Sequence, residues 1–214
     1  MSEAPLSRRE RQRLETRAEL VKAAHAIVQD EGYEALTIRK LADKVGLATM
    51  SVYSYFADKQ AILTAVAEDT FEQLARRIDN TRPADPIEAL RVGLREYVAF
   101  GLENPNEYRT IFMTPQVHEH DDESFEQLEA QNPAFQTLLQ SVNLAMDAGQ
   151  LKGDARAVST LLWTAAHGAV SLILTFHNYP FGDPIAYADR VIDMAIGALA
   201  HQDVEPLGPD SAWC

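Results

Sequence analysis

Small hydroxyl side chains and aromatic rings lie close together in the segment T-M-S-V-Y-S-Y-F, from Thr49 to Phe56. Hydroxyl and phenol groups donate and accept hydrogen bonds, and a methionine makes apolar contacts, for instance with a thymine methyl group. Groups of this size fit a DNA groove. The chemistry that this segment predicts is therefore contact with base edges and phosphates, without any bond being made or broken.

Two short helical patterns that meet at Gly46 position these side chains. The first pattern has apolar residues at i, i+3, i+4 and i+7, namely Ile38, Leu41, Ala42 and Val45. Thr37 suits its N-cap, and Gly46 suits its C-cap because glycine adopts the left-handed conformation without steric cost. A second helix begins near Ala48 or Thr49. Two small helices joined by a glycine turn predict a helix-turn-helix, whose second helix lies in the major groove.

The run G-L-A-T-M-S-V-Y-S-Y-F-A-D-K-Q-A-I-L resembles the recognition segment of TetR-family transcriptional regulators, and the resemblance extends from about Arg17 to Phe71. The upstream run E-G-Y-E-A-L-T-I-R-K-L-A is similar to the family's first-helix exit and second helix. One departure is Ala48, where many members have a serine cap. If Thr49 takes over the capping role, it no longer serves base contact. The family positions that match are Gly46, Tyr53, Tyr55, Phe56, Lys59 and Gln60.

Candidate DNA contacts follow from the motif. We expect Thr49, Met50 and Ser51 to face base edges. A second group positions the protein on phosphates, with Lys59 in the first turn of the next helix beside its free N–H groups. For Lys59 the alternative is an ordinary exposed lysine. The expected phosphate contacts are Arg39, Tyr53, Tyr55 and Lys59.

The N-terminal part of the predicted DNA-binding domain begins with a polar segment. We expect residues 1–13 to be a flexible tail whose arginines follow a phosphate backbone or enter a minor groove; the alternative is a solvated tail. The first helix is predicted from Leu14 to Glu31, with His25 as a structural or surface residue. The helix-turn-helix domain is predicted over residues 14–76. The arginines of the tail are Arg8, Arg9, Arg11 and Arg13.

Long apolar helical patterns follow. Asp58 to Asn80 predicts a connector helix, apolar on so wide a face that it must contact two bodies. Residues 77–202 then predict a larger helical domain, and residues 203–214 a second flexible tail. The last two helices of the larger domain, at about 154–178 and 184–201, form the expected homodimer interface, because two helices per subunit make a symmetric four-helix contact. The alternative is that they form the core of a monomer.

The run W-T-A-A-H-G, from Trp163 to Gly168, resembles the signature of a TetR-family C-terminal domain type called WHG. A ligand pocket is mostly apolar with a few polar groups, and His167 is the polar residue we favour for a specific contact. For each residue the alternative is plain core packing. The candidate pocket residues are Tyr97, Phe100, Tyr108, Phe112, Met113, Trp163, His167 and Phe176.

Charge, cysteine content and hydropathy limit the remaining classes. The net charge of the 214-residue chain is −13, but residues 1–60 have ten basic and nine acidic side chains (+1), whereas residues 61–214 have nine and twenty-three (−14). The excess negative charge therefore lies outside the segment with the predicted DNA contacts, and the net charge of the chain does not argue against DNA binding. The single cysteine, Cys214, permits no intrachain disulfide and suits a reducing cytoplasm. There is no secretory signal and no uninterrupted apolar run long enough for a membrane span, so we expect no membrane partner.

The sequence therefore predicts an all-α fold, in which a three-helix helix-turn-helix bundle is joined by a long helix to a ligand-binding and dimerisation domain. The function it predicts is a cytoplasmic repressor that binds a palindromic double-stranded DNA operator as a homodimer and is released by a small apolar or aromatic effector. No cofactor is expected, and for the acidic loop from His118 to Glu123 solvation is favoured over a metal site. The alternatives are an all-α enzyme with its active site in the C-terminal domain, and an adaptor whose helix-turn-helix binds protein.

Overall fold

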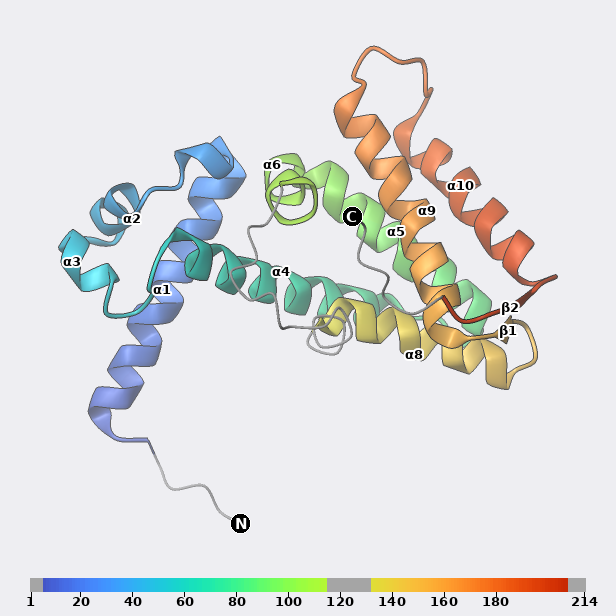
Figure 1. Ribbon diagram of the computed structural model, residues 1–214, viewed down its shortest axis with the longest axis horizontal. Coiled ribbons are helices and arrows are strands. Elements are labelled where there is room, and N and C mark those ends of the chain that lie inside the picture. The colour runs from blue at the N-terminus through green and yellow to red at the C-terminus, as the bar shows by residue number, and fades with distance from the viewer. Residues whose placement is uncertain (1–5, 115–131, 208–214) are drawn as a thin grey trace. The chain divides into compact units, whose positions relative to one another are not determined.

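The computed structural model describes residues 6–114 and 132–207, and this part of the chain is almost entirely helical (Figure 1). The all-α prediction is confirmed. The loop from His118 to Glu123 lies outside the described residues. In chain order the elements are α1 Arg8–Glu31, the 3-10 helix η1 Tyr33–Ala35, α2 Ile38–Val45, α3 Thr49–Val52, α4 Lys59–Thr81, α5 Pro86–Glu103, α6 Pro105–Tyr108, the π-helix η2 Arg109–Met113, α8 Pro133–Asp147, strand β1 Lys152–Gly153, α9 Ala155–Thr175, α10 Pro184–Leu199 and strand β2 Asp203–Val204.

The chain forms two compact units, and α4 belongs to both. The first unit comprises Met1–Thr70 and Asn104–Pro115, and the second comprises Phe71–Glu103 and Gln116–Cys214. The sequence predicted a single boundary between residues 76 and 77. In the structure, the boundary between the two compact units falls within α4, between Thr70 and Phe71. Helices α6 and η2 belong to the first unit, because α6 packs on α1 and η2 continues from α6.

The core of the first unit is built by α1, α2, α3 and the first turns of α4. Leu20, Ala24 and Ile27, which the sequence predicted as the inward face of the first helix, are at most 1% exposed. Leu41 of α2 and Val52 of α3 are fully buried in the same cluster. Burying side chains of this size removes much apolar surface from water, which holds the two short helices at a fixed angle.

The predicted start of the first helix is wrong. We expected a flexible tail to residue 13 and a helix from Leu14, whereas α1 begins at Arg8. Ser7 is its N-cap: the Ser7 hydroxyl accepts a hydrogen bond from the Glu10 N–H (3.2 Å), and Glu10 Oε2 accepts one from the Ser7 N–H (2.7 Å). This capping box satisfies two backbone donors and stabilises a helix start that has no apolar face.

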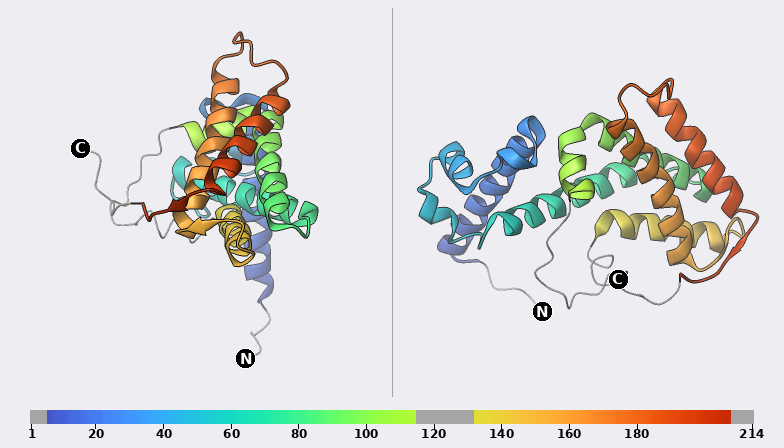
Figure 2. Two further views of the ribbon diagram at one scale, coloured as in Figure 1. Left: turned by 90° about the vertical axis from the view of Figure 1, so that its right-hand side faces the viewer. Right: turned by 45° about the horizontal axis from the view of Figure 1, so that its top comes forward.

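In the second unit, α5, α8, α9 and α10 pack on one another. Figures 1 and 2 show α9 and α10 lying side by side, and each of them also contacts α5. Asp154 caps α9 and Asp183 caps α10, each accepting a backbone N–H at 2.8 Å. The predicted helices at 154–178 and 184–201 are thus confirmed to within a few residues at each end.

Helix α9 is the one helix of the described residues that is long and apolar enough to cross a membrane by length and composition. The criterion of an uninterrupted apolar run missed it, because Ser159, Thr164 and His167 interrupt the pattern. The helix packs against α5, α8 and α10 of the same unit, and core helices of this kind pass the same test.

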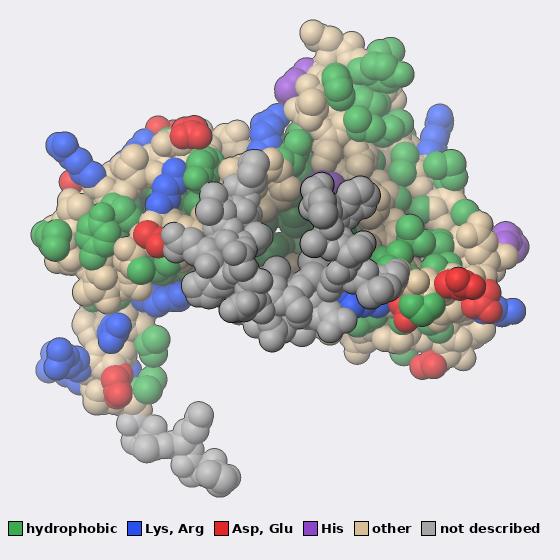
Figure 3. Space-filling view, viewed as in Figure 1, with side chains coloured by type: hydrophobic (Ala, Val, Ile, Leu, Met, Phe, Trp, Pro, Cys, Tyr) green, Lys and Arg blue, Asp and Glu red, His purple; other side chains and the backbone are tan. Residues whose placement is uncertain are grey.

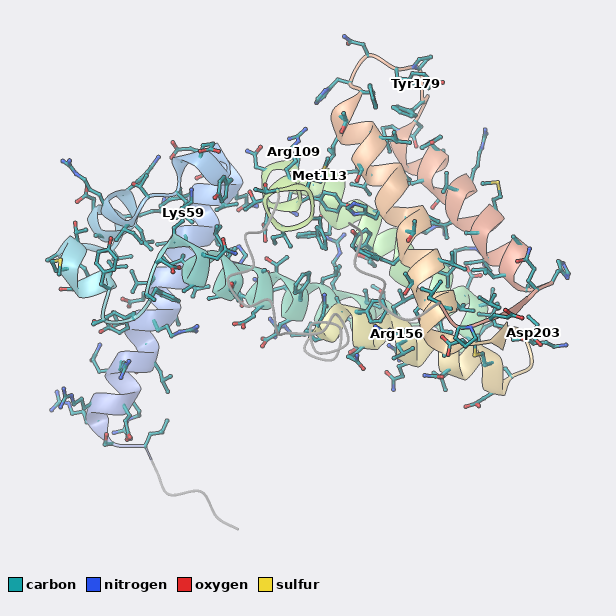
Figure 4. All side chains as sticks on the ribbon, viewed as in Figure 1. Lys59, Arg109, Met113, Arg156, Tyr179 and Asp203 are labelled. Carbon is teal, nitrogen blue, oxygen red and sulfur yellow. The ribbon has the colours of Figure 1, made fainter. Side chains whose placement is uncertain are left out.

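The predicted C-terminal tail contains a short ordered segment. We expected residues 203–214 to be flexible, whereas β2 pairs in parallel with β1, with Lys152 opposite Asp203 and Gly153 opposite Val204. The Asp154 N–H also donates to the Val204 carbonyl at 2.7 Å. Figure 4 labels Asp203, where the chain returns to the segment before α9 after leaving α10. The sequence has no alternating pattern here, because each strand has only two residues.

Candidate nucleic-acid interface and effector site

The helix-turn-helix is formed by α2, the turn at Gly46 and α3. The Thr37 hydroxyl accepts from the Lys40 N–H at 3.1 Å and caps α2, as predicted. Gly46 has φ 70° and ψ 28°, the left-handed conformation, and the Leu47 N–H closes the turn on the Ala42 carbonyl at 2.9 Å. Glycine adopts this conformation without strain, which explains the residue type at this position.

The structure decides which residue caps α3. Ala48 occupies the N-cap position with an extended backbone, and its side chain makes no capping bond. Thr49 is therefore the first helical residue and not the cap. Its exposed side chain is not used in capping and is available for contact.

The candidate DNA contacts divide by exposure. On the outer face of α3, Thr49 is exposed and Met50 is 78% exposed, whereas Ser51 is half-buried. Tyr53, which follows α3 directly, is 47% exposed, and Arg39 of α2 is exposed. Thr49 and Met50 thus lie on the solvent-facing side of a short helix whose other side is anchored by the buried Val52.

Two of the proposed phosphate contacts are occupied within the first unit. Tyr55 is half-buried and packs against the apolar core of this unit. The Lys59 ammonium donates to the Tyr33 carbonyl at 2.9 Å and lies 3.7 Å from the centroid of the Tyr33 ring, at the first turn of α4 (Figure 4). Burial lowers the pKa of Lys59, and Glu34 opposes this shift. To reach a phosphate, Lys59 must exchange its bond to Tyr33.

Two arginines brace the turn after α3, a role that the sequence did not predict for either of them. Arg13 Nη2 donates to the Ser54 carbonyl at 3.4 Å, and the guanidinium carbon of Arg17 lies 5.0 Å from the centroid of the Phe56 ring. Arg13 belongs to the segment predicted as a flexible tail, whereas Arg17 belongs to the predicted first helix. For Arg13 the signal available was the S-R-R-E capping pattern at Ser7 to Glu10, which starts the helix before it.

A polar cluster joins α5 to α9 in the second unit. Tyr97, only 7% exposed, has its hydroxyl 3.1 Å from His167 Nδ1 and accepts a hydrogen bond from Trp163 Nε1 at 3.2 Å. Ser171 Oγ lies 3.1 Å from His167 Nε2, and the Trp163 and His167 rings are 5.5 Å apart between centroids. The structure thus brings together three of the predicted pocket residues and adds Ser171.

Burial lowers the pKa of His167 below its ordinary value of 6.5, which favours the neutral imidazole. A neutral imidazole has one donor and one acceptor nitrogen, so it relays hydrogen bonds between the Tyr97 phenol and the Ser171 hydroxyl. A neutral cluster of this kind can orient a bound molecule by hydrogen bonding rather than by charge.

The other predicted pocket residues lie elsewhere. Phe100 is half-buried on α5, and Phe176, at the end of α9, is 53% exposed. Tyr108, Phe112 and Met113 belong to the first unit, where the Tyr108 and Phe112 rings are 4.8 Å apart between centroids and Met113 is 37% exposed. Arg109 and Met113 lie at the two ends of η2 (Figure 4). The predicted set therefore does not belong to a single unit.

Two family models match the chain. Residues 20–66 match the model described as "Bacterial regulatory proteins, tetR family", and residues 90–195 match the one described as "Tetracyclin repressor-like, C-terminal domain". The chain belongs to the TetR family. It is accordingly a DNA-binding transcriptional regulator. The second description does not name the WHG type, so that assignment stays a prediction.

Individual relatives agree with this family. The chain is 21% identical over 194 residues to the HTH-type transcriptional repressor AcnR of Corynebacterium glutamicum, and the match covers 88% of this chain and 94% of AcnR. A TetR-family regulator from Pectobacterium atrosepticum has a similar structure, with a TM-score of 0.69 at 18% identity over 93% of this chain and 100% of that one. RolR, solved in complex with resorcinol, has a TM-score of 0.63 and is 20% identical in sequence. The match covers 94% of this chain and 99% of RolR. These two structures show a shared fold.

Proposed function

We propose that this TetR-family chain is a cytoplasmic repressor that binds a palindromic operator as a homodimer and is released by a small effector. The observation that supports the DNA end most directly is the outer face of α3. Thr49, Met50 and Tyr53 project from a helix whose inner residue Val52 is fully buried. This arrangement suits a reading helix in a major groove, with Thr49 and Met50 on base edges and Tyr53 on a phosphate. AcnR, a relative over most of its length, is named as a repressor.

For the effector we propose a small, mostly apolar or aromatic compound with at least one hydrogen-bonding group. The Tyr97, Trp163 and His167 cluster offers aromatic surface together with a neutral imidazole, which suits an uncharged or weakly polar ligand. RolR, which shares the fold, was solved with resorcinol, a ligand of this class. Tyr108, Phe112 and Met113 belong to the first unit and are not part of this proposed site.

We propose that the dimer forms through α9 and α10. Large apolar side chains are exposed on both helices: Leu161 and Leu172 are 41% and 42% exposed, and Met194 is 70% exposed. A Cβ atom added at Gly168 or Gly197 would meet nothing within 4 Å, so a partner helix has room to approach closely there. Exposed apolar surface of this kind is typical of an interface between subunits.

Release would then be a shift in population. An effector that binds more tightly to a conformation in which the two reading helices are wrongly spaced lowers DNA affinity, and DNA lowers effector affinity by the same factor. The coupling needs no new chemistry. No enzymatic step forms part of this proposal.

The experiment is a selection of bound duplexes from a random-sequence pool, followed by native mass spectrometry of the protein alone and with the selected duplex. A palindromic site bound by two chains is expected, with affinity falling steeply as salt rises. M194D is expected to yield monomers and to lose most of the affinity, whereas L207D, at another exposed apolar residue, is expected to remain dimeric. Selection of a single half-site by a monomer would contradict the proposal, and so would a dimer that M194D leaves intact.

A further inference from the structure

We propose that the N-terminal half of α1, residues Arg8–Glu19, is a DNA-binding arm that contacts the phosphate backbone flanking the segment read by α3. The proposal rests on the function proposed above, because it assumes that α3 reads an operator. It extends the interface beyond the helix-turn-helix to a part of the chain outside the match to the TetR DNA-binding model, which begins at residue 20.

The arm contributes no buried side chain to the folded unit. No residue from Arg8 to Glu19 is buried, and the first buried residue of α1 is Leu20. A helical segment without a packed apolar face depends for its stability on its caps and on its continuation from the packed half of the helix. The Ser7–Glu10 capping box supplies such a cap. The chain therefore maintains a helix here that the apolar core does not require.

The charge of the arm opposes helix stability and favours a polyanion. Residues 8–17 contain five arginines and two glutamates, a local charge of +3 in a chain whose net charge is −13. Cations in the first turn are repelled by the positive end of the helix dipole, so Arg8 and Arg9 are poorly placed for stability. Neither of these two arginines has a hydrogen-bond or ion-pair partner among the residues that the structure describes. An anionic partner outside the chain accounts for both observations.

The arm is fixed relative to the reading helix. Arg13 donates to the Ser54 carbonyl at 3.4 Å and Arg17 lies over the Phe56 ring at 5.0 Å, and both partners are in the turn that follows α3. Figure 1 shows the N-terminal half of α1 continuing beyond α3, and Figure 3 shows Lys and Arg side chains gathered at this end of the helix. A surface that is basic and rigidly joined to a DNA-reading helix suits DNA phosphates better than any other polyanion.

The reach of the arm sets the length of DNA that it contacts. An α-helix rises about 1.5 Å per residue, so Arg8 lies about 18 Å along α1 from Leu20. At about 3.4 Å per base pair this distance corresponds to about five base pairs. The arm therefore contacts phosphates within about five base pairs of the site read by α3, on each side of a palindrome.

The test compares R8Q/R9Q with the wild-type chain on a duplex selected by the wild type from a random pool. Both positions are exposed and the capping box is kept, and thermal unfolding monitored by circular dichroism checks the fold. K152Q, which removes an exposed positive charge from the second unit, is the control. Affinity for selected and unrelated duplexes is measured between about 50 and 200 mM salt, on duplexes with flanks of about five base pairs and on duplexes trimmed to the site.

On flanked duplexes we expect R8Q/R9Q to weaken binding at least about ten-fold. The slope of the logarithm of the binding constant against the logarithm of the salt concentration should become less steep by about 0.9 for each phosphate that the variant no longer neutralises. The weakening should be similar for all sequences and should largely disappear on trimmed duplexes, whereas K152Q should match the wild type. If R8Q/R9Q matches K152Q on flanked duplexes while the wild type binds normally, the arm is not a DNA contact and the regulator function stands. If the wild type enriches no duplex, the regulator function and the arm both fail.

Discussion

His25 Nδ1 of α1 lies 3.3 Å from Glu107 Oε1 of α6, and this pair ties two elements of the first unit that are far apart in sequence. The other ring nitrogen, Nε2, lies 3.1 Å from Asp69 Oδ2 of α4, and the two form an ion pair when the imidazole is protonated. Glu107 is 5% exposed and is also within hydrogen-bonding reach of the Thr70 hydroxyl. A buried carboxylate thus depends on a histidine for its positive partner.

The stability of the protein is expected to depend on the protonation of this histidine. Burial is the largest influence and lowers the pKa of His25, but the hydrogen bond and charge of Glu107, together with Asp69, outweigh it and raise the pKa above its ordinary value of 6.5. The folded protein therefore binds this proton more tightly than the unfolded chain. The stabilisation is fully present below the ordinary pKa of 6.5 and is lost as the pH rises through the raised folded pKa.

H25Q removes this contribution. We expect it to lower the free energy of unfolding by about 2 kcal/mol at about pH 6, because Glu107 remains buried without its cation, and by less at about pH 9. Urea unfolding at the two pH values measures the difference. H177Q, at an exposed histidine, is the control and should change neither value. An H25Q variant that loses equal stability at both pH values would show that His25 acts through packing alone.

The polar cluster of the second unit gives a second prediction. Y97F removes the acceptor of the Trp163 N–H and a partner of His167 while keeping the buried ring. Leaving the Trp163 N–H without this acceptor is expected to cost about 1–2 kcal/mol in the free energy of unfolding. The matched control is Y187F, because Tyr187 is also part-buried and packs through its ring against Phe181. Chemical denaturation measures the free energy of unfolding of both variants. Equal losses in Y97F and Y187F would mean that the hydrogen bonds of the Tyr97 hydroxyl contribute no net stability.

The helix-turn-helix could be predicted from sequence because its determinants are local. The spacing of Leu41, Ala42 and Val45 sets one helix face, and Gly46 is required by its left-handed backbone. The same holds for α9 and α10, where an acidic cap precedes a regular apolar pattern. Local signals of this kind need no knowledge of the partner elements.

The start of α1 and the contacts within the polar cluster of the second unit could not be predicted in the same way. The residues from Arg8 have no apolar face, so the spacing of apolar residues does not predict a helix there. Only the capping pattern at Ser7 indicates it. Tyr97 and His167 are 70 residues apart, and their contact depends on the rotation of α5 relative to α9, which sequence spacing does not determine. The packing of Tyr55 on the core of the first unit was likewise not predicted, and its phosphate contact stays a prediction.

The pairing of β1 with β2 gives a third prediction, at Gly153. This residue has φ 99°, and a Cβ atom added to it would lie 2.2 Å from the Val204 carbonyl oxygen. G153A is therefore expected to break the strand pair and free the segment after α10, in addition to a backbone cost of about 1–2 kcal/mol. G149A is the matched control, because Gly149 has φ 71° but open space around it. Limited proteolysis should cleave near residue 203 in G153A and not in G149A. Equal cleavage of both variants would mean that the strand pair does not protect this segment.

The last prediction separates base contact from phosphate contact at α3. Met50, 78% exposed, is proposed to make apolar contact with base edges, so M50A should lose about 1 kcal/mol of binding free energy for the preferred base pair, the order expected for burying part of this side chain, and little for its replacements. Tyr53, 47% exposed, is proposed to donate to a phosphate, so Y53F should weaken binding to every sequence alike. Dissociation constants for the selected operator and for a series of single base-pair replacements measure both effects. A change of base preference in Y53F, or a uniform loss in M50A, would reverse the two assignments and would require α3 to lie in the groove with a different face toward the bases.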